Sequence, residues 1–254
     1  MNLTDMTWPD VERLSRDMPV VIPIAAIEQH GPHLPLFTDS MLLGEIVRRV
    51  SGAMQETVLF TPLMWLGNSE HHIDFPGTLS ASPRTYLNML NEMIENLLRY
   101  GFRRIVLLNG HGGNSIPGKQ AVFEIRQKHR ARKDLLLLCA TYWESADPRE
   151  GRADLVQEGM WHACEWETSM ILRIAPHLVR EISKLKTIPS GSVFEPVHRA
   201  WTTNDRSDLG YLGSPQAGNV EKGEHLFQVF SGGVTKMLAQ VIAWDGKSWD
   251  CPPQ

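Results

Sequence analysis

Residues 19–39 read PVVIPIAAIEQHGPHLPLFTD, an apolar run of strand length that passes at once into a polar stretch with two prolines. The first part, residues 19–27, is rich in β-branched side chains, which predicts a short buried β-strand. Three more apolar runs of strand length follow along the chain, at residues 57–63, 104–108 and 135–140. The way these runs alternate with helical patterns decides the expected fold class.

Apolar residues with helical spacing separate the predicted strands. Helices are expected at residues 41–50, 82–98, 120–129, 167–174 and 221–244. Ser82 followed by Pro83 is typical of a helix start, and Gly101 should end that helix. The adjacent glycines Gly232 and Gly233 predict a weak point in the last helix.

The repeated strand–helix–strand order predicts an α/β fold of three layers, with a mostly parallel sheet covered by helices on both faces. No internal repeat or low-complexity linker divides the chain, so we expect a single domain over residues 1–254. Residues 188–217 are rich in Gly, Pro and Ser and lack clear periodicity. We expect this segment to be a lid, an intersubunit loop or irregular surface.

The composition narrows the classes of function. A formal net charge of -4 gives no electrostatic reason to expect a nucleic acid or an anionic membrane as partner. We find no apolar run of the roughly 20 residues that cross a bilayer, and the polar N-terminus lacks the pattern of a secretory signal. Cys139, Cys164 and Cys251 are too few and too scattered for a disulfide framework, so a reducing, cytoplasmic setting is expected.

The densest group of potential ligands follows the first predicted strand. Glu28 and His30 are two residues apart, so in an extended segment their side chains point to the same side. Asp39 comes after the proline-containing loop, which could fold it back onto them. Ligands bind beyond the carboxyl ends of strands in open parallel sheets, and mixed oxygen and imidazole donors suit a divalent ion. The alternative is a polar loop with a hydrogen-bonded histidine.

A second group follows the predicted strand at 104–108, in the turn NGHGGN at residues 109–114. His111 lies at the strand end, and the glycines around it allow a close approach of the backbone to a ligand. Backbone N–H groups from Gly110 to Gly113 are expected to bind a substrate oxygen. One alternative is a phosphate-binding loop, although the Lys-Ser/Thr ending is missing; another is a tight turn with an incidental histidine.

The third group lies in WHACEWETS at residues 161–169. Glu167 opens an apolar helical run, where an ordinary first-turn glutamate interacting with the helix dipole would look the same. Glu165 is equally well explained as a solvated neighbour. His162 is five residues before Glu167, and the two would lie on different faces of one helix. We therefore expect His162 in the preceding loop, where it is free to move protons.

In this order, the three groups resemble the motifs of the creatininase family. Glu28, His30 and Asp39 match the first motif, and NGHGGN at 109–114 matches the second. The third motif is matched by His162 with Glu167, Thr168 and Ser169, and Cys164 replaces a glycine within it. Two further family segments are FPGT at residues 75–78 and GSP at residues 213–215. The resemblance spans roughly residues 15–240, and ordered motifs are far more specific than any single one.

The resemblance implies a compact α/β/α fold and an amidohydrolase that acts on a C–N bond of a small or cyclic amide. It implies two divalent metal ions, Zn²⁺ and/or Mn²⁺, and the donor set also admits Fe²⁺. Asp39 would bridge the ions, Glu28 and His111 would complete one site, and His30 and Glu167 the other. Such ions lower the pKa of a shared water.

The resemblance also assigns roles outside the metal ligands. His162 matches the proton-transfer histidine of the family, which would carry a proton to the leaving nitrogen. Trp143 matches an aromatic residue near the substrate, although core packing explains a tryptophan there equally well. Further substrate contacts are expected from Trp161, Gly110, Gly112 and His72. The expected partners are a small-molecule amide and other copies of the chain, because the family implies a homo-oligomer, often a hexamer.

Two departures put creatinine itself in doubt as the substrate. Creatininase proper carries a glutamate two residues after the histidine of its second motif, and Gly113 stands there in this chain. Its mobile tryptophan is replaced by Glu158, and Trp161 is nearby but not equivalent in spacing. The Gly-Gly form resembles the broader family, so a formamide deformylase or a peptide-trimming peptidase is the alternative. A non-catalytic binding protein is disfavoured because unpaired buried carboxylates are costly without a cation.

Overall fold

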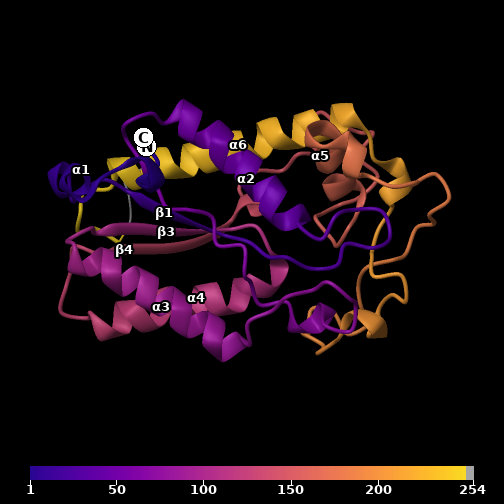
Figure 1. Cartoon of the computed structure of the whole chain (residues 1–254), viewed down its shortest axis with the longest axis horizontal. Helices are drawn as coiled ribbons and strands as arrows, with labels where there is room; N and C mark the ends of the chain where they lie inside the picture. The colour runs from indigo at the N-terminus through magenta and orange to yellow at the C-terminus, as the bar shows by residue number, and fades with distance from the viewer. Residues whose placement is uncertain (250–254) are drawn as a thin grey trace.

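Four parallel strands form the central sheet of the computed structural model, which describes residues 1–249 (Figure 1). In chain order they are β1 (Val20–Ile24), β2 (Leu59–Phe60), β3 (Arg104–Asn109) and β4 (Leu136–Thr141). Their order across the sheet is β2-β1-β3-β4, and every neighbouring pair is parallel. The predicted parallel sheet is therefore confirmed.

Five long helices cover the two faces of this sheet (Figure 1). One face carries α2 (Thr38–Ala53), α5 (Glu165–Ile174) and α6 (Val220–Ala243), and the other carries α3 (Pro83–Arg99) and α4 (Ser115–Lys128). The short helix α1 (Trp8–Arg13) precedes the sheet, and its single turn has too little periodicity to be predicted. The three-layer α/β/α arrangement is confirmed.

Residues of β1 alternate between two hydrophobic clusters, as the period of a strand requires. Val21 packs in the cluster beneath α2, α5 and α6, whereas Val20, Ile22 and Ile24 pack in the cluster against α3 and α4. All five residues of the strand are buried, which explains why it reads as a continuous apolar run. Because both faces of this strand are buried, it can be recognised in the sequence as an uninterrupted apolar run.

Seven short 3₁₀ turns occupy the connections, and several carry residues of the site described below. They are Leu3–Asp5, Glu70–His72 (η2), Gly112–Asn114 (η3), Tyr142–Glu144 (η4), Pro176–Leu178, Thr203–Asp205 (η6) and Pro215–Ala217. η3 leads directly into α4, so this helix begins at Ser115 and not at residue 120. The predicted strand at 57–63 is reduced to β2, because Pro62 cannot donate to a strand ladder.

The predicted weak point in the last helix is wrong. α6 runs without interruption from Val220 to Ala243, through both Gly232 and Gly233. A Cβ atom on Gly233 would lie 2.6 Å from the Ser145 Oγ and 2.7 Å from the Ser145 backbone oxygen. Gly233 therefore permits a close approach of α6 to the turn that follows β4, and this contact offsets the lower helix propensity of glycine.

By length and composition α6 alone, among the described residues, resembles a helix that could cross a membrane. No such segment was expected from the sequence. In this structure one face of α6 packs against α2 and α5, with Leu226, Phe227 and Phe230 fully buried. The same residues that make the helix apolar thus form the core of the layer above the sheet.

Residues 188–217 form the long segment without strands that the sequence predicts, drawn in orange in Figure 1. One isolated bridge joins Ile188 to Gly213, so the ends of the segment lie together. Val193 and Val197 between them are exposed, whereas Tyr211 is buried and donates to the Lys186 backbone oxygen at 2.8 Å. Tyr211 is therefore a core residue.

Candidate functional site

The carboxyl ends of β1 and β3 lie side by side, because Ile24 is in register with Asn109. Glu28 and His30 follow β1, and His111 follows β3, so the parallel register brings the first two ligand groups to one edge of the sheet. The loop after β1 turns back, and the Glu28 backbone N–H donates to the Leu36 oxygen at 2.9 Å. This turn delivers Asp39 on the first turn of α2.

Asp39 lies at the centre of the cluster, with its two oxygens facing different histidines. Oδ1 is 3.1 Å from His30 Nε2, and Oδ2 is 3.0 Å from His111 Nδ1. On the His111 side, Nε2 lies 3.4 Å from Glu28 Oε2. On the His30 side, Nε2 lies 3.8 Å from Glu167 Oε1. The five side chains therefore form two carboxylate–histidine pairs that share Asp39, the grouping that the sequence analysis expects.

The carboxylates of this cluster are buried and incompletely satisfied. Glu28, Asp39 and Glu167 are 1%, 4% and 5% exposed. Among the described residues, one oxygen of each has no hydrogen-bond partner: Glu28 Oε2, Asp39 Oδ2 and Glu167 Oε2. Asp39 Oδ2 is close to His111 Nδ1, yet the pair lacks hydrogen-bond geometry. Buried carboxylates are paired or coordinate cations, so this donor set fits divalent metal ions.

Charges within the cluster shift its pKa values. Burial alone would lower the pKa of His30 and of His111, but carboxylates raise both well above the usual value: Asp39 and Glu167 at His30, and Glu28 and Asp39 at His111. Burial opposes ionisation of Asp39 as well, and its two histidine neighbours nevertheless lower its pKa. At Glu167 burial dominates and raises the pKa. A cation between these groups would compete with the protons on the histidines, so metal affinity should fall as pH falls.

His162 lies in the loop before α5, as predicted, and beside the cluster. Its Nε2 is 2.8 Å from the Gln29 backbone oxygen, which can only accept, and 2.9 Å from the Gln29 side-chain Nε2. The tautomer that satisfies the backbone oxygen carries its proton on Nε2 and leaves Nδ1 as the base. Nδ1 lies 3.6 Å from Glu28 Oε1, and the ring stacks on His72 with centroids 4.2 Å apart. Burial, followed by the charge of His30, lowers the pKa of His162 to about 3. A neutral imidazole thus faces the carboxylate cluster.

A cavity of about 210 Å³ opens onto these groups. Of the residues expected to contact substrate, Trp143, Trp161, Gly112 and His72 line this cavity. Gly110 does not, and its predicted role is contradicted. Its N–H donates to the Ile24 backbone oxygen at 2.9 Å, and a Cβ atom there would lie 2.8 Å from the Leu43 side chain. Gly110 therefore closes the packing between β3, β1 and α2, with no N–H free for a substrate.

His71, Trp201 and Arg206 also line the cavity; before the FPGT segment His71, like His72, was a candidate pocket residue, whereas no substrate contact was expected from Trp201 or Arg206. His71 follows no strand end and lies in η2, next to the more buried His72. Trp201 and Arg206 belong to the segment 188–217, where no periodicity points to a site. Only the folding of this segment over the edge of the sheet identifies them.

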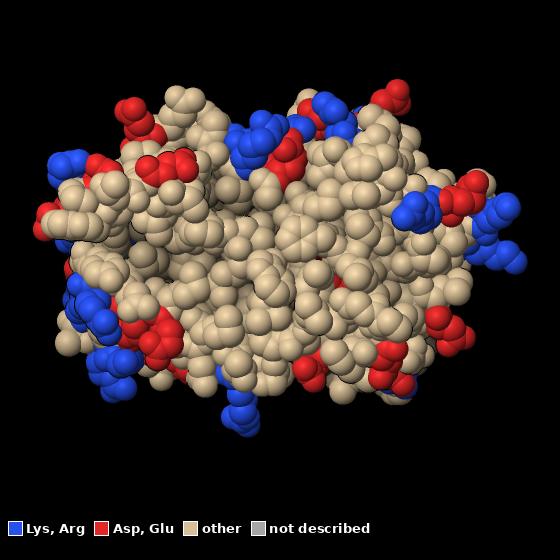
Figure 2. Space-filling model, in the orientation of Figure 1, with Lys and Arg blue, Asp and Glu red and all other residues tan. Residues whose placement is uncertain are grey.

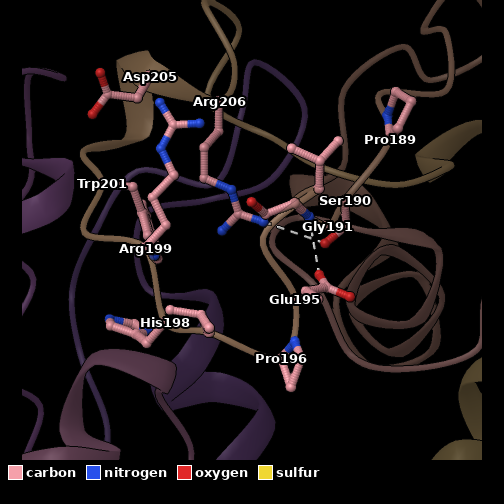
Figure 3. A pocket seen from close by; sticks show the side chains of 13 residues that line it. Pro189, Ser190, Gly191, Glu195, Pro196, His198, Arg199, Trp201, Asp205 and Arg206 are labelled. Carbon is pink, nitrogen blue, oxygen red and sulfur yellow. Dashed lines mark hydrogen bonds between the residues drawn. The ribbon is translucent and has the colours of Figure 1, made fainter.

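A larger cavity of about 590 Å³ adjoins the first one (Figure 3). Both cavities are lined by Ser190, Trp201 and Arg206. In Figure 3 the Arg206 side chain extends between the segment around Ser190 and that around Trp201. Its guanidinium donates to the Ser190 Oγ at 3.3 Å and lies 4.6 Å from the centre of the Trp201 ring.

Buried polar contacts hold α5 and its candidate ligand Glu167 in place. Glu165 is fully buried, which contradicts the interpretation of a solvated neighbour. It pairs with Lys222 of α6 at 2.5 Å and also accepts from the backbone N–H of Gln157 at 3.0 Å. His33 has its Nε2 3.0 Å from the Ala163 backbone oxygen, just before α5. These contacts position the first turn of α5 without touching the carboxylates of the cluster.

The chain is similar in sequence to known enzymes over most of its length. It is 27% identical to a creatinine amidohydrolase from Pseudomonas putida, over 93% of this chain and 95% of that protein. It is 30% identical to a mycofactocin precursor peptide peptidase from Mycolicibacterium smegmatis, over 82% of this chain and 79% of that protein.

Solved structures give the same result. A creatininase mutant complexed with creatine superposes with a TM-score of 0.79 at 26% identity, covering 95% of this chain and 98% of that one. Two others are described as a manganese creatininase and a mutant creatininase of Zn-Zn type, with TM-scores of 0.77 and 0.76 at 26% identity; each covers 94% of this chain and 97% of its own. The family model for creatininase, creatinine amidohydrolase, matches residues 4–238. The chain therefore belongs to the creatininase family.

Proposed function

We propose that this chain is a metal-dependent amidohydrolase that holds two divalent cations, Zn²⁺ and/or Mn²⁺. The observation that carries the proposal is the position of Asp39, whose two oxygens face two separate carboxylate–histidine pairs. The orphaned oxygens on all three carboxylates support it, and so do the manganese and zinc named for related creatininases. Fe²⁺ fits the same donors.

Each ligand has a distinct role in this proposal. Asp39 would be shared by the two cations, Glu28 and His111 would complete one site, and His30 and Glu167 would complete the other. Bound cations supply Lewis-acid activation of water and of a carbonyl group. The buried carboxylates offset the charge of the cations and fix their separation, because the packing of α2 and α5 leaves Asp39 and Glu167 little freedom.

His162 is the residue proposed to move the proton during hydrolysis. Its Nδ1 is unprotonated and points toward Glu28, since Nε2 donates to the Gln29 backbone. An imidazole in this state takes a proton from an attacking water and passes it to the leaving nitrogen. Trp143 and Trp161 line the same cavity and give apolar surface on which a small amide can lie.

The adjoining cavity favours a second candidate, hydrolysis of a peptide or another amide that carries a carboxylate. Arg206 is the sole lysine or arginine that lines the cavity of the cluster, and within residues 1–249 no carboxylate lies at ion-pair distance from it. A guanidinium binds a carboxylate through two parallel hydrogen bonds. A cavity of about 590 Å³ beyond Arg206 also has room for more than a small ring. Relatedness to a peptide peptidase agrees with this candidate.

A substrate screen with matched pairs tests both candidates. The protein is loaded with Zn²⁺ or Mn²⁺, and release of amine is followed with lactams, formamides and short peptides offered as C-terminal acids and as C-terminal amides. The proposed function requires turnover that depends on added metal; no metal bound and no turnover would exclude it. The second candidate predicts that peptide acids are cleaved faster than the matching amides. It also predicts that Arg206→Gln removes this preference by raising the KM for the acids.

We also expect the protein to form a homo-oligomer, a hexamer by its family, and to act in the cytoplasm. Val193, Phe194 and Val197 support an assembly, because they present exposed apolar side chains on the segment 188–217. Light scattering coupled to gel filtration gives the mass, and a monomer at micromolar concentration would contradict this expectation.

A further inference from the structure

His71 lies beside the carboxylate–histidine pair formed by Glu28 and His111. One potential ligand atom from each of these three residues lies within 4.8 Å of the other two. The rings of His71 and His111 are nearly parallel, at 8°, with centroids 5.8 Å apart. His71 also lines the cavity of the cluster, so it faces the same space as the expected ligands.

The absence of a side chain at Gly113 makes room for this histidine. A Cβ atom built on Gly113 would lie 2.1 Å from the Asn68 backbone oxygen, 2.5 Å from the Nε2 of His111 and 2.8 Å from the Cε1 of His71. A larger residue at position 113 would therefore have to displace the Asn68 backbone as well as the His71 and His111 rings. The glycine that departs from creatininase proper and the histidine in η2 are thus two parts of one arrangement.

The surrounding residues hold His71 in place but leave its ring nitrogens free. Its backbone oxygen accepts from the Thr203 hydroxyl at 2.6 Å, and the Trp201 ring packs edge-on against it at 4.8 Å. Among residues 1–249 its ring makes no hydrogen bond, whereas Nδ1 of His72 lies 2.6 Å from the Thr203 Oγ1 and 2.8 Å from the Gln29 Nε2. A fixed, neutral imidazole with a free nitrogen is a common metal ligand.

We propose that His71 is a direct ligand of the cation held by Glu28 and His111, in place of a carboxylate at position 113. This inference rests on the proposed two-cation site. A histidine ligand also changes the net charge of the site, because imidazole is neutral whereas a carboxylate carries one negative charge. Among residues 1–249, Glu28, Asp39 and Glu167 are then the carboxylates of the cluster, and two divalent cations would leave one positive charge in excess. An anionic substrate is favoured by that excess, in agreement with the position of Arg206.

Zn²⁺ binding by the purified protein tests the assignment without any substrate. Loss of an outer-shell partner costs roughly 10–100-fold in metal affinity. His71→Ala should therefore weaken one of the two Zn²⁺ sites by at least about tenfold and leave the other unchanged, as measured by competition with a chromophoric chelator. His198→Ala is the matched control, since His198 lines the adjoining cavity and does not line the cavity of the cluster.

Two further measurements separate a ligand from a merely structural histidine. His71→Asp, which restores a donor, should regain much of the lost affinity, and added imidazole should do so in His71→Gly. In the Co²⁺ protein the visible absorption should change in His71→Ala and not in His198→Ala.

If a folded His71→Ala protein binds both Zn²⁺ ions as tightly as the wild type does, the assignment is overturned and the proposed function is left intact. A wild-type protein that binds no metal would instead overturn the proposed function.

Discussion

At the scale of single residues, the site depends on where Asp39 points its two oxygens. Each oxygen is within 3.1 Å of a different histidine, and each histidine has its own glutamate. No other carboxylate of the cluster lies at ion-pair distance from both His30 and His111. Asp39 is therefore the residue whose removal should separate the two halves of the site.

Asp39→Asn is expected to lose at least one of two metal equivalents and to lower turnover by more than about 100-fold. An amide offers one acceptor oxygen and no charge, so it cannot bridge two cations as a carboxylate does. Metal analysis after dialysis and amidase assays measure both effects. Asp134→Asn serves as control, because Asp134 pairs with Arg132 on the surface. A variant that keeps two equivalents and full activity would contradict the bridging role.

His162→Gln should keep both metals and lose turnover by roughly 10²–10⁴-fold, the usual contribution of a general acid–base residue. Glutamine can retain the hydrogen bond to the Gln29 backbone oxygen but cannot accept a proton at neutral pH. Metal content and kcat are measured on one preparation. If kcat is unchanged, His162 does not carry the proton; if metal is lost, it is a ligand.

At the scale of elements, ion pairs tie the three helices of one layer together. Glu224 of α6 pairs with Arg49 of α2 at 2.8 Å and with Arg173 of α5 at 2.7 Å. Deeper in the same layer, Lys222 pairs with Glu165 at the start of α5. Because α2 carries Asp39 and α5 carries Glu167, these contacts also set the distance between two of the proposed metal ligands.

Glu224→Gln should destabilise the protein by about 1–2 kcal/mol at pH 7, somewhat less than the roughly 1.5–3 kcal/mol of a hydrogen bond to a charged group, because solvent screens a carboxylate that is 30% exposed. Hydrogen bonds from Arg49 lower the pKa of Glu224 to about 2, below the usual value near 4.5. A lowered pKa means that this stabilisation is fully present above about pH 4.5 and is lost as pH falls toward 2. Urea unfolding should show a difference in the free energy of unfolding between wild type and variant, and this difference should disappear as the pH falls toward 2.

At the scale of the whole molecule, the site lies where a rigid sheet edge meets an irregular segment. The proposed ligands come from the ends of β1 and β3 and from the first turns of α2 and α5. Residues 188–217 add Trp201 and Arg206 and build the second cavity (Figure 3). On the face shown in Figure 2, side chains of both charges lie around the rim and the centre is largely uncharged. Because residues 188–217 build the second cavity and the sheet edge carries the proposed ligands, substrate specificity should depend on residues 188–217 and metal binding on the sheet edge.

Removal of metal should lower the stability of the whole chain. A ligand at 100 times its Kd stabilises a protein by about 2.7 kcal/mol, and each kcal/mol shifts Tm by roughly 2–4 °C in a chain of this size. The Tm should therefore fall by several degrees in EDTA and recover with Zn²⁺ or Mn²⁺. In Asp39→Asn the difference between EDTA and metal should be smaller. Equal Tm values for wild type with and without metal would argue against a buried cation site.

Much of the fold follows from local patterns in the sequence. Strands β1, β3 and β4 are found within one or two residues at most ends, because buried parallel strands read as apolar runs. Gly233 shows the limit of such reasoning: its helix propensity is poor, but a contact with Ser145 outweighs it. Glu165 shows the same limit, since its partner Lys222 is far away in the sequence.

The sequence by itself determined the fold class and the set of potential ligands, because strand periodicity and the motifs at strand ends are local. Only the tertiary structure decided that Asp39 faces two histidines, that Gly110 packs against its neighbours without lining the cavity, and that His71 lies beside Gly113. It alone placed Arg206 at the cavity. The reason is physical: which donors meet depends on strand register and loop closure, and neither can be read from a residue and its neighbours in the chain.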